Sequence, residues 1–251
     1  RIHLAQQIHR PLPESFQHSV CPFFCQNSTE YTLYYTFCSP DCQAAPSGAV
    51  LRLRHAERDG TGLRLGKQGE STFVAFQLVY AIKILRTYAV EKNDTDYIKY
   101  LDEIGAKLDT ILSACWNEDR WIRGYKEDGA IIGQRTDPEA SMWLNPQSWS
   151  VISGFGTKEQ QEKAMDSVYR ELNTPYGAMV MYPPYVKHGF PGALMQCFNK
   201  CTKENAGIFS QPQGWLILAE SKLGHGNRAY QYWTEAAPAT YNDNAEHRVL
   251  E

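Results

Sequence analysis

Between residues 71 and 112, apolar side chains recur at the three- and four-residue spacing of α-helices, and this pattern constrains the fold more than any other feature. The first predicted helix begins at Ser71 and is apolar on most faces, which predicts a buried position. The second begins after a capping Asp94 or Thr95 and carries an apolar stripe from Tyr97 to Leu112. Together they predict an antiparallel helix pair.

More helices are predicted in the rest of the chain, each bounded by Gly, Pro or a capping side chain, over residues 146–153, 158–172, 213–223 and 227–236. One short β-hairpin is predicted over 121–133, because its Asp128-Gly129 step favours a tight turn. Helix pairs separated by long loops predict a mainly α fold, a partial α/α toroid in which loops at the inner helix ends build the site.

The composition changes abruptly near residue 62. Residues 1–61 contain no Lys and no Trp but four of the seven Cys, and no helical or strand period persists in them. We leave residues 1–61 unassigned and place residues 62–251 in the predicted barrel. The chain starts with Arg1 and ends at Glu251 directly after a helix-like segment, so we expect a barrel truncated at both ends.

Composition argues against several classes of partner. The net charge of −3 and the pI near 6.2 provide no basic field of the kind that nucleic acid or anionic lipid requires. By sequence, no apolar run approaches the roughly 18 residues that span a bilayer, and the first residues do not form a basic and then apolar leader. We expect a cytoplasmic protein that binds neither nucleic acid nor membrane.

The seven Cys are an odd number, so they cannot all pair within one chain. Cys21, Cys25, Cys38 and Cys42 form two Cys-x-x-x-Cys pairs, which four-thiolate zinc binding would use. Spacing alone is a weak signal, and reduced, partly buried thiols are the favoured interpretation. The sequence therefore predicts no metal site.

The chemically most informative segment is Lys203-Glu204-Asn205-Ala206-Gly207-Ile208-Phe209, directly before a predicted helix start. By residue type alone, Lys203 and Glu204 favour a solvated ion pair. A cation and a carboxylate held side by side also suit sugar hydroxyls, because they donate and accept hydrogen bonds in fixed directions.

This segment resembles a motif of glycoside hydrolase family 94, the inverting phosphorylases of cellobiose, chitobiose and cellobionate. Five other motifs occur in the family's order, so that the resemblance covers residues 62–251. The six motifs are residues 66–71, 121–125 with 128–129, 145–154, 182–185, 203–209 and 226–232. The resemblance implies an (α/α)6 catalytic barrel and implies that Lys203 and Glu204 bind sugar hydroxyls.

Members of the family cleave a β-linked disaccharide with inorganic phosphate to give an α-sugar 1-phosphate and a free sugar. Because phosphate is itself the nucleophile, the resemblance implies one carboxylic acid and donors for phosphate, with no metal and no organic cofactor. Thr61 stands at the family's acid position and cannot act as an acid at neutral pH, although Asp59 lies two residues away. The catalytic residue is therefore left unassigned, and we expect the chain to be inactive alone.

Gln211 stands where the family commonly has a His that contacts phosphate. A neutral amide cannot supply the positive charge of protonated His, so weaker phosphate binding is expected. Trp121 and Arg123 are left out of the site, since a Trp in a hairpin is more often a packing residue. The parent enzyme is expected to be a homodimer.

Two alternatives stay open. The first is a non-catalytic carbohydrate-binding or interaction module that has lost the acid but keeps Lys203 and Glu204. The weaker alternative is a toroidal hydrolase with Glu118 or Asp119 as the base that activates water, although a polar loop is the commoner role for such residues.

Overall fold

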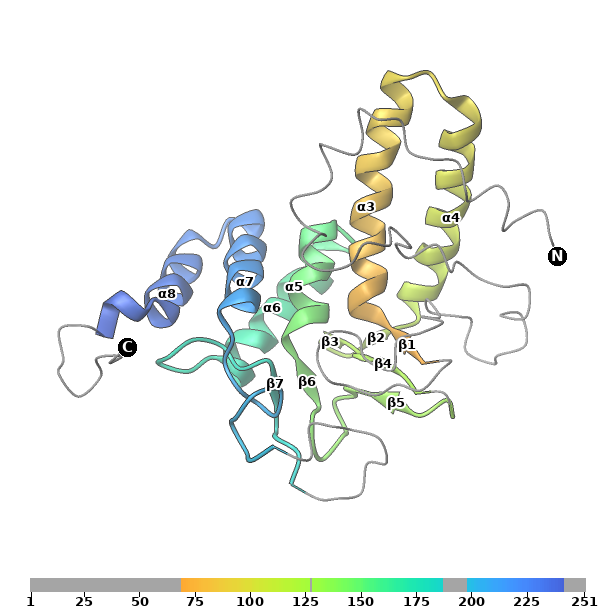
Figure 1. The fold of residues 1–251 in the computed structure, drawn as a ribbon. Helices are drawn as coiled ribbons and strands as arrows, with labels where there is room; N and C mark the ends of the chain where they lie inside the picture. The colour runs from red at the N-terminus through yellow and green to blue at the C-terminus, as the bar shows by residue number, and fades with distance from the viewer. Residues whose placement is uncertain (1–68, 127, 187–197, 242–251) are drawn as a thin grey trace, which may run out of the picture.

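The computed structural model describes residues 69–126, 128–186 and 198–241, which are mainly α-helical (Figure 1). This confirms the predicted fold class. The helices are α3 (Thr72–Glu91), α4 (Thr95–Ser113), α5 (Leu144–Ser153), α6 (Lys158–Leu172), α7 (Ser210–Leu223) and α8 (Gly226–Ala236), followed by the 3-10 helix η4 (Pro238–Tyr241). They form three consecutive packed pairs, in which α3 contacts α4, α5 contacts α6 and α7 contacts α8.

The first helices of the three pairs pack side by side, α3 on α5 and α5 on α7. Figure 1 shows that all three begin at the same end of the molecule. Loops at that end are therefore brought together although they are distant in sequence. An (α/α)6 toroid is a closed ring of six helix pairs, and the described residues contain three pairs, so the toroid stays a prediction.

Short antiparallel strands lie at this same end (Figure 1). They are β1 (Glu70–Ser71), β2 (Trp116–Asn117), β3 (Arg120–Trp121), β4 (Gly124–Tyr125), β5 (Ile131–Ile132), β6 (Met142–Trp143) and β7 (Met181–Tyr182). The pairing of β4 with β5 confirms the predicted hairpin, and β1 adds to it through Ser71 opposite Gly124. A Cβ at Gly124 would lie 2.1 Å from the carbonyl oxygen of Glu70, so this close pairing requires glycine.

Side-chain caps explain the starts of three of the six described α-helices, α3, α4 and α6. Ser71 caps α3 and Asp94 caps α4, as predicted, and Thr157 forms a capping box with Gln160 at the start of α6. Helices α5 and α7 begin two or three residues earlier than predicted. Their N-cap residues are Trp143 and Phe209, which make no side-chain capping bond, so the sequence carries no start signal there.

The core joins α3 to the hairpin region and to the end of α5. The rings of Phe76, Trp121 and Phe155 pack with centroids 5.4–5.5 Å apart. Trp121 is 1% exposed, which confirms that it is a packing residue and not an open platform for a sugar.

The structure corrects the prediction that α3 is buried. Phe76 and Ile82 are buried, but Tyr80, Ile84 and Val90 are exposed. Against the expectation from sequence, α3 has the length and apolar composition of a membrane span, and 28% of its most apolar 18-residue window is buried. Core helices of globular proteins have the same composition, and α3 packs on both α4 and α5, so the membrane prediction remains untested.

Candidate functional site

Lys203 and Glu204 lie in the loop that leads into α7. Figure 1 shows that α7 begins at the end of the molecule where the strands lie. Lys203 is exposed, and its Nζ is 4.8 Å from the ring centroid of Phe198, a cation–π contact. Glu204 is half-buried, and within the described residues its buried Oε2 has no hydrogen-bond partner. Over those residues the two side chains form no ion pair with each other, so they are not the solvated pair that residue type favours.

The segment 201–207, named here the Lys203 turn, has a tight and partly left-handed backbone. Cys201, Lys203 and Ala206 have φ angles of 60°, 48° and 62°, a region that costs non-glycine residues about 1–2 kcal/mol each. The Gly207 N–H donates to the Lys203 carbonyl at 3.0 Å, and a Cβ on Gly207 would lie 2.1 Å from that oxygen. Interactions with the rest of the fold must hold this conformation.

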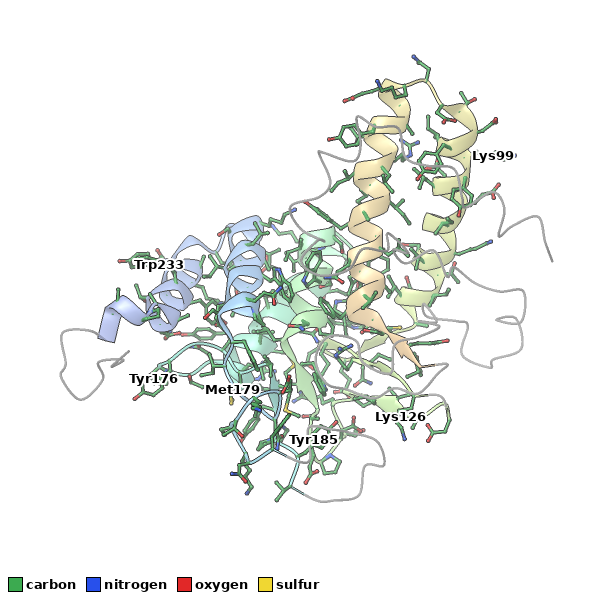
Figure 2. All side chains as sticks on the ribbon, in the orientation of Figure 1. Lys99, Lys126, Tyr176, Met179, Tyr185 and Trp233 are labelled. Atoms are coloured by element: carbon green, nitrogen blue, oxygen red, sulfur yellow. The ribbon has the colours of Figure 1, made fainter. Side chains whose placement is uncertain are left out.

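Asn205 supplies such an interaction. Its fully buried side chain accepts a hydrogen bond from the Tyr185 N–H at 2.7 Å, and its Nδ2 donates to the carbonyl oxygens of Tyr185 and Phe198, both at 3.0 Å. Figure 2 labels Tyr185 at the same end of the molecule as the strands. The bonds of Asn205 therefore join motif 203–209 to motif 182–185, twenty residues earlier.

Two other buried amides make the same arrangement, which we call an amide clamp: the side chain pairs with both backbone groups of one residue and donates to one more carbonyl. Gln147 on α5 accepts from the Trp121 N–H at 2.8 Å and donates to the Trp121 carbonyl at 2.9 Å. Gln213 on α7 accepts from the Ala178 N–H at 2.9 Å and donates to its carbonyl at 2.7 Å. The sequence analysis missed all three clamps, whose partners are distant along the chain.

Arg123 joins motifs 66–71 and 121–125, and its charge also acts on Tyr185 of motif 182–185. Its fully buried guanidinium donates from Nη1 to Ser71 Oγ at 2.7 Å and lies 5.7 and 5.4 Å from the ring centroids of Phe73 and Trp143. Burial lowers the pKa of Arg123 to about 9, so the group stays charged at neutral pH. Burial raises the pKa of the neighbouring Tyr185 hydroxyl.

Motif 226–232 has a different role. Arg228 donates to Asp166 at 2.9 Å and to the buried Glu220 at 3.4 Å, and His225 Nδ1 lies 2.7 Å from Glu220 Oε2. Burial raises the pKa of Glu220, although His225 and Arg228 oppose the shift. These bonds attach α8 to α6 and α7 and do not reach the Lys203 turn.

Asp119 does not suit the role of a catalytic base. It binds Arg120 at 2.8 Å, Arg135 at 2.7 Å and Arg170 at 2.9 Å. Burial raises the pKa of Asp119. Hydrogen bonds from Arg120 and Ser167 and the adjacent cations outweigh burial and lower this pKa to about 2, so Asp119 is a weak base. Its partners identify a structural ion-pair network.

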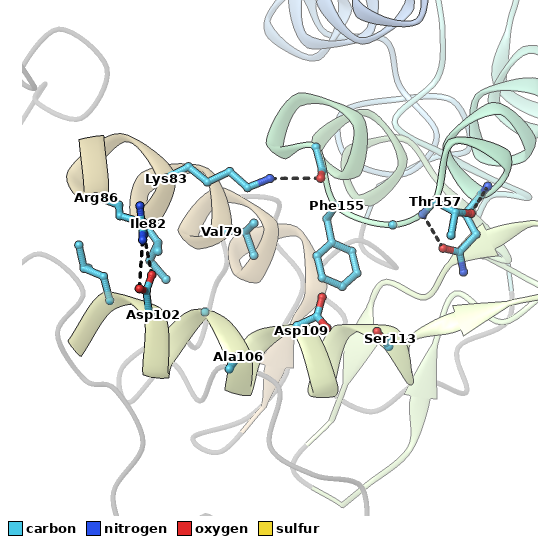
Figure 3. Close-up of a pocket in the computed structure, with 15 residues that line it drawn as sticks. Val79, Ile82, Lys83, Arg86, Asp102, Ala106, Asp109, Ser113, Phe155 and Thr157 are labelled. Atoms are coloured by element: carbon cyan, nitrogen blue, oxygen red, sulfur yellow. Dashed lines mark hydrogen bonds and ion pairs between the residues drawn. The ribbon is translucent and has the colours of Figure 1, made fainter. Parts of the chain in front are cut away.

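A groove of about 590 Å³ lies between α3, α4 and the turn that follows α5 (Figure 3). Val79 and Phe155 line it, and at its rim Arg86 and Asp102 form an ion pair at 2.6 Å. Lys83 donates at 2.6 Å to a carbonyl at the C-terminal end of α5. None of the predicted site residues lines this groove, so it is separate from the Lys203 turn.

Gln211 lies exposed in the first turn of α7, and Phe209 provides no side-chain cap there. Thr61 and Asp59 lie outside the described residues, as does the Cys21–Cys42 region, so the structure assigns no catalytic residue. Within the described segments, no cluster of three or more His, Cys, Asp or Glu suits a metal ion. The expectation that no metal is needed stays a prediction.

Comparison with known proteins places the chain in a family. The glycosyl hydrolase 94 superfamily catalytic domain matches residues 48–251, starting within the segment that we left unassigned. N,N'-diacetylchitobiose phosphorylase of Vibrio furnissii is 32% identical over 73% of this chain, and cellobionic acid phosphorylase of Neurospora crassa is 31% identical over 68%. A 3-O-beta-D-glucopyranosyl-beta-D-glucuronide phosphorylase of Paenibacillus borealis is 28% identical over 72%. The matches cover 22–23% of the length of these relatives. Because the family match covers most of the residues of this chain, the protein belongs to the glycosyl hydrolase 94 superfamily.

Proposed function

We propose that this chain is part of the catalytic domain of an inverting disaccharide phosphorylase. In the intact family enzyme a phosphate oxygen attacks the anomeric carbon from the face opposite the glycosidic bond, that bond breaks, and the leaving oxygen takes the proton of a carboxylic acid, which becomes a carboxylate. The products are an α-sugar 1-phosphate and a free sugar. Family membership and the three phosphorylase relatives support this reaction, with phosphate and a β-linked disaccharide as substrates.

Lys203 and Glu204 bind sugar hydroxyls in this proposal, and the observation that carries it is the buried Glu204 Oε2 without a partner in the described chain. A buried carboxylate oxygen without a donor is costly, and a sugar hydroxyl supplies that donor. The same hydroxyls accept from the exposed ammonium of Lys203. The held turn fixes the directions in which both groups meet the ring.

Phosphate is proposed to bind near Gln211, because the first turn of a helix presents backbone N–H groups that favour anions. The neutral Gln211 side chain adds a hydrogen bond without adding charge. We propose that no metal or organic cofactor takes part, and that the intact enzyme is a cytoplasmic homodimer that binds neither nucleic acid nor membrane. The net charge of −3 supports the absence of these anionic partners.

Calorimetry tests sugar binding. The purified chain is titrated with cellobiose, N,N'-diacetylchitobiose and cellobionate. The substitution Glu204→Gln is expected to weaken the binding of the tightest-bound of these sugars by roughly 10-fold or more. Glu159→Gln is the matched control, because Glu159 lies on α6 and forms an exposed ion pair with Lys163. Equal affinity of the Glu204→Gln variant and the unsubstituted chain would refute the role of Glu204.

Activity tests the missing acid. With Thr61 in place of the acid, we expect no sugar 1-phosphate when the chain is incubated with these disaccharides and phosphate, and product from the pure chain would overturn this expectation. The alternative function, a non-catalytic carbohydrate-binding module, is favoured by Thr61 at the position where the resemblance places the acid. Sugar 1-phosphate formed by a Thr61→Asp variant supports the phosphorylase, whereas binding without turnover in that variant supports the module.

A further inference from the structure

Three amide clamps stabilise this end of the molecule, but the clamp of Asn205 alone among them is next in sequence to a candidate sugar ligand. Asn205 follows Glu204 directly and lies inside the Lys203 turn. Its three side-chain bonds go to Tyr185 and Phe198, outside the turn, so they attach the turn to neighbouring loop segments. The bonds of Gln147 have the same number and type, but they hold the hairpin at Trp121.

The turn needs this attachment because its backbone is strained. Lys203 and Ala206, on either side of Glu204 and Asn205, have the left-handed φ angles that non-glycine residues avoid. We expect a turn released from the clamp to relax toward ordinary φ values, which would rotate the peptide groups that carry both candidate ligands. Phe198 makes two contacts with the turn: its carbonyl accepts a hydrogen bond from Asn205, and its ring lies against Lys203 Nζ.

We propose that Asn205 is a positioning residue for sugar binding, a role that rests on the proposed function of Lys203 and Glu204. Asn205 does not itself contact the sugar. Its amide holds the Lys203 ammonium and the Glu204 carboxylate at the spacing that the hydroxyls of one sugar ring require. Loss of the clamp is expected to weaken disaccharide binding roughly 10- to 100-fold, since small displacements of binding groups have large effects.

The experiment compares Asn205→Ala with Gln147→Ala in the complete chain. Calorimetry measures the affinity for whichever of cellobiose, N,N'-diacetylchitobiose and cellobionate the unsubstituted chain binds best. Hydrogen exchange measures the Tyr185 and Trp121 amides, which donate to Asn205 and Gln147. We expect each variant to expose its own amide and only Asn205→Ala to lose sugar affinity.

Asn205→Ser is a milder, uncharged variant in case Asn205→Ala does not fold. Its single hydroxyl can replace only part of the three bonds that the amide makes to Tyr185 and Phe198, so an intermediate affinity is expected. Unchanged sugar affinity together with faster Tyr185 exchange overturns the positioning role and leaves the proposed function intact. Equal loss of affinity in Gln147→Ala also overturns it, because the effect is then general destabilisation. If the unsubstituted chain binds none of the sugars, the proposed function fails first and this inference fails with it.

Discussion

Replacing Gly207 with Ala tests how tight the Lys203 turn is. The added Cβ would lie 2.1 Å from the Lys203 carbonyl oxygen, whereas such contacts below 3.0 Å essentially never occur. The turn must therefore open by about 0.9 Å, the difference between these distances. Forcing extra atoms into packed structure costs about 1–3 kcal/mol. For a domain of this size each kcal/mol lowers the Tm by about 2–4 °C, so we expect a decrease of roughly 2–12 °C.

Gly214 is the matched control for this substitution. It lies exposed within α7, and apart from the neighbouring backbone of its own helix no atom lies within 4 Å of the Cβ that Ala would add. Because Ala is favoured over Gly by about 0.8–1.0 kcal/mol inside a helix, Gly214→Ala is expected to raise the Tm by roughly 2–4 °C. Thermal unfolding followed by circular dichroism measures both variants. The reasoning is refuted if Gly207→Ala is as stable as the unsubstituted chain, or if both substitutions destabilise equally.

Other substitutions test the turn, the ion-pair network and the core. Cys201→Gly relieves a φ angle of 60° at an exposed position and is expected to stabilise the fold by about 0.5–1 kcal/mol in urea unfolding, whereas a loss would contradict the strain. The pKa of Asp119 is about 2 in the folded state and about 3.9 in an unfolded chain. The ionised carboxylate therefore stabilises the fold fully above about pH 3.9, and this stabilisation is lost as the pH falls toward 2. Asp119→Asn should therefore flatten the pH dependence of the urea midpoint in this range, and an unchanged slope would argue against the network. Met165→Ala empties a fully buried position and is expected to cost about 2–5 kcal/mol, and a cost below about 1 kcal/mol would show that the core closes around the gap.

Helix positions were predictable wherever a polar cap marks a boundary. Ser71, Asp94 and Thr157 begin helices because their side chains bind backbone N–H groups three residues ahead, a signal contained in a few neighbouring residues. The starts of α5 and α7 were missed because Trp143 and Phe209 provide no such bond. Their positions follow instead from the packing of these helices within the fold.

The candidate site was predictable only in part. Lys203 and Glu204 were selected from the sequence by their adjacency and their resemblance to a family motif. That Glu204 Oε2 is buried, and that Asn205 clamps Tyr185, depends on contacts across segments distant in the chain. A hydrogen bond between residues twenty positions apart leaves no periodic signal, so sequence reasoning did not find it.

The sequence alone determined the succession of helices, the Asp-Gly hairpin and the family, because helical hydrogen bonds, caps and turns act over a few residues and motifs are read directly. Only the tertiary structure decided that α3 keeps exposed apolar residues, that Arg123 is buried between Phe73 and Trp143, and that three amides act as clamps. Burial and side-chain partners depend on which surfaces meet when distant segments pack, and that choice is made by the whole fold.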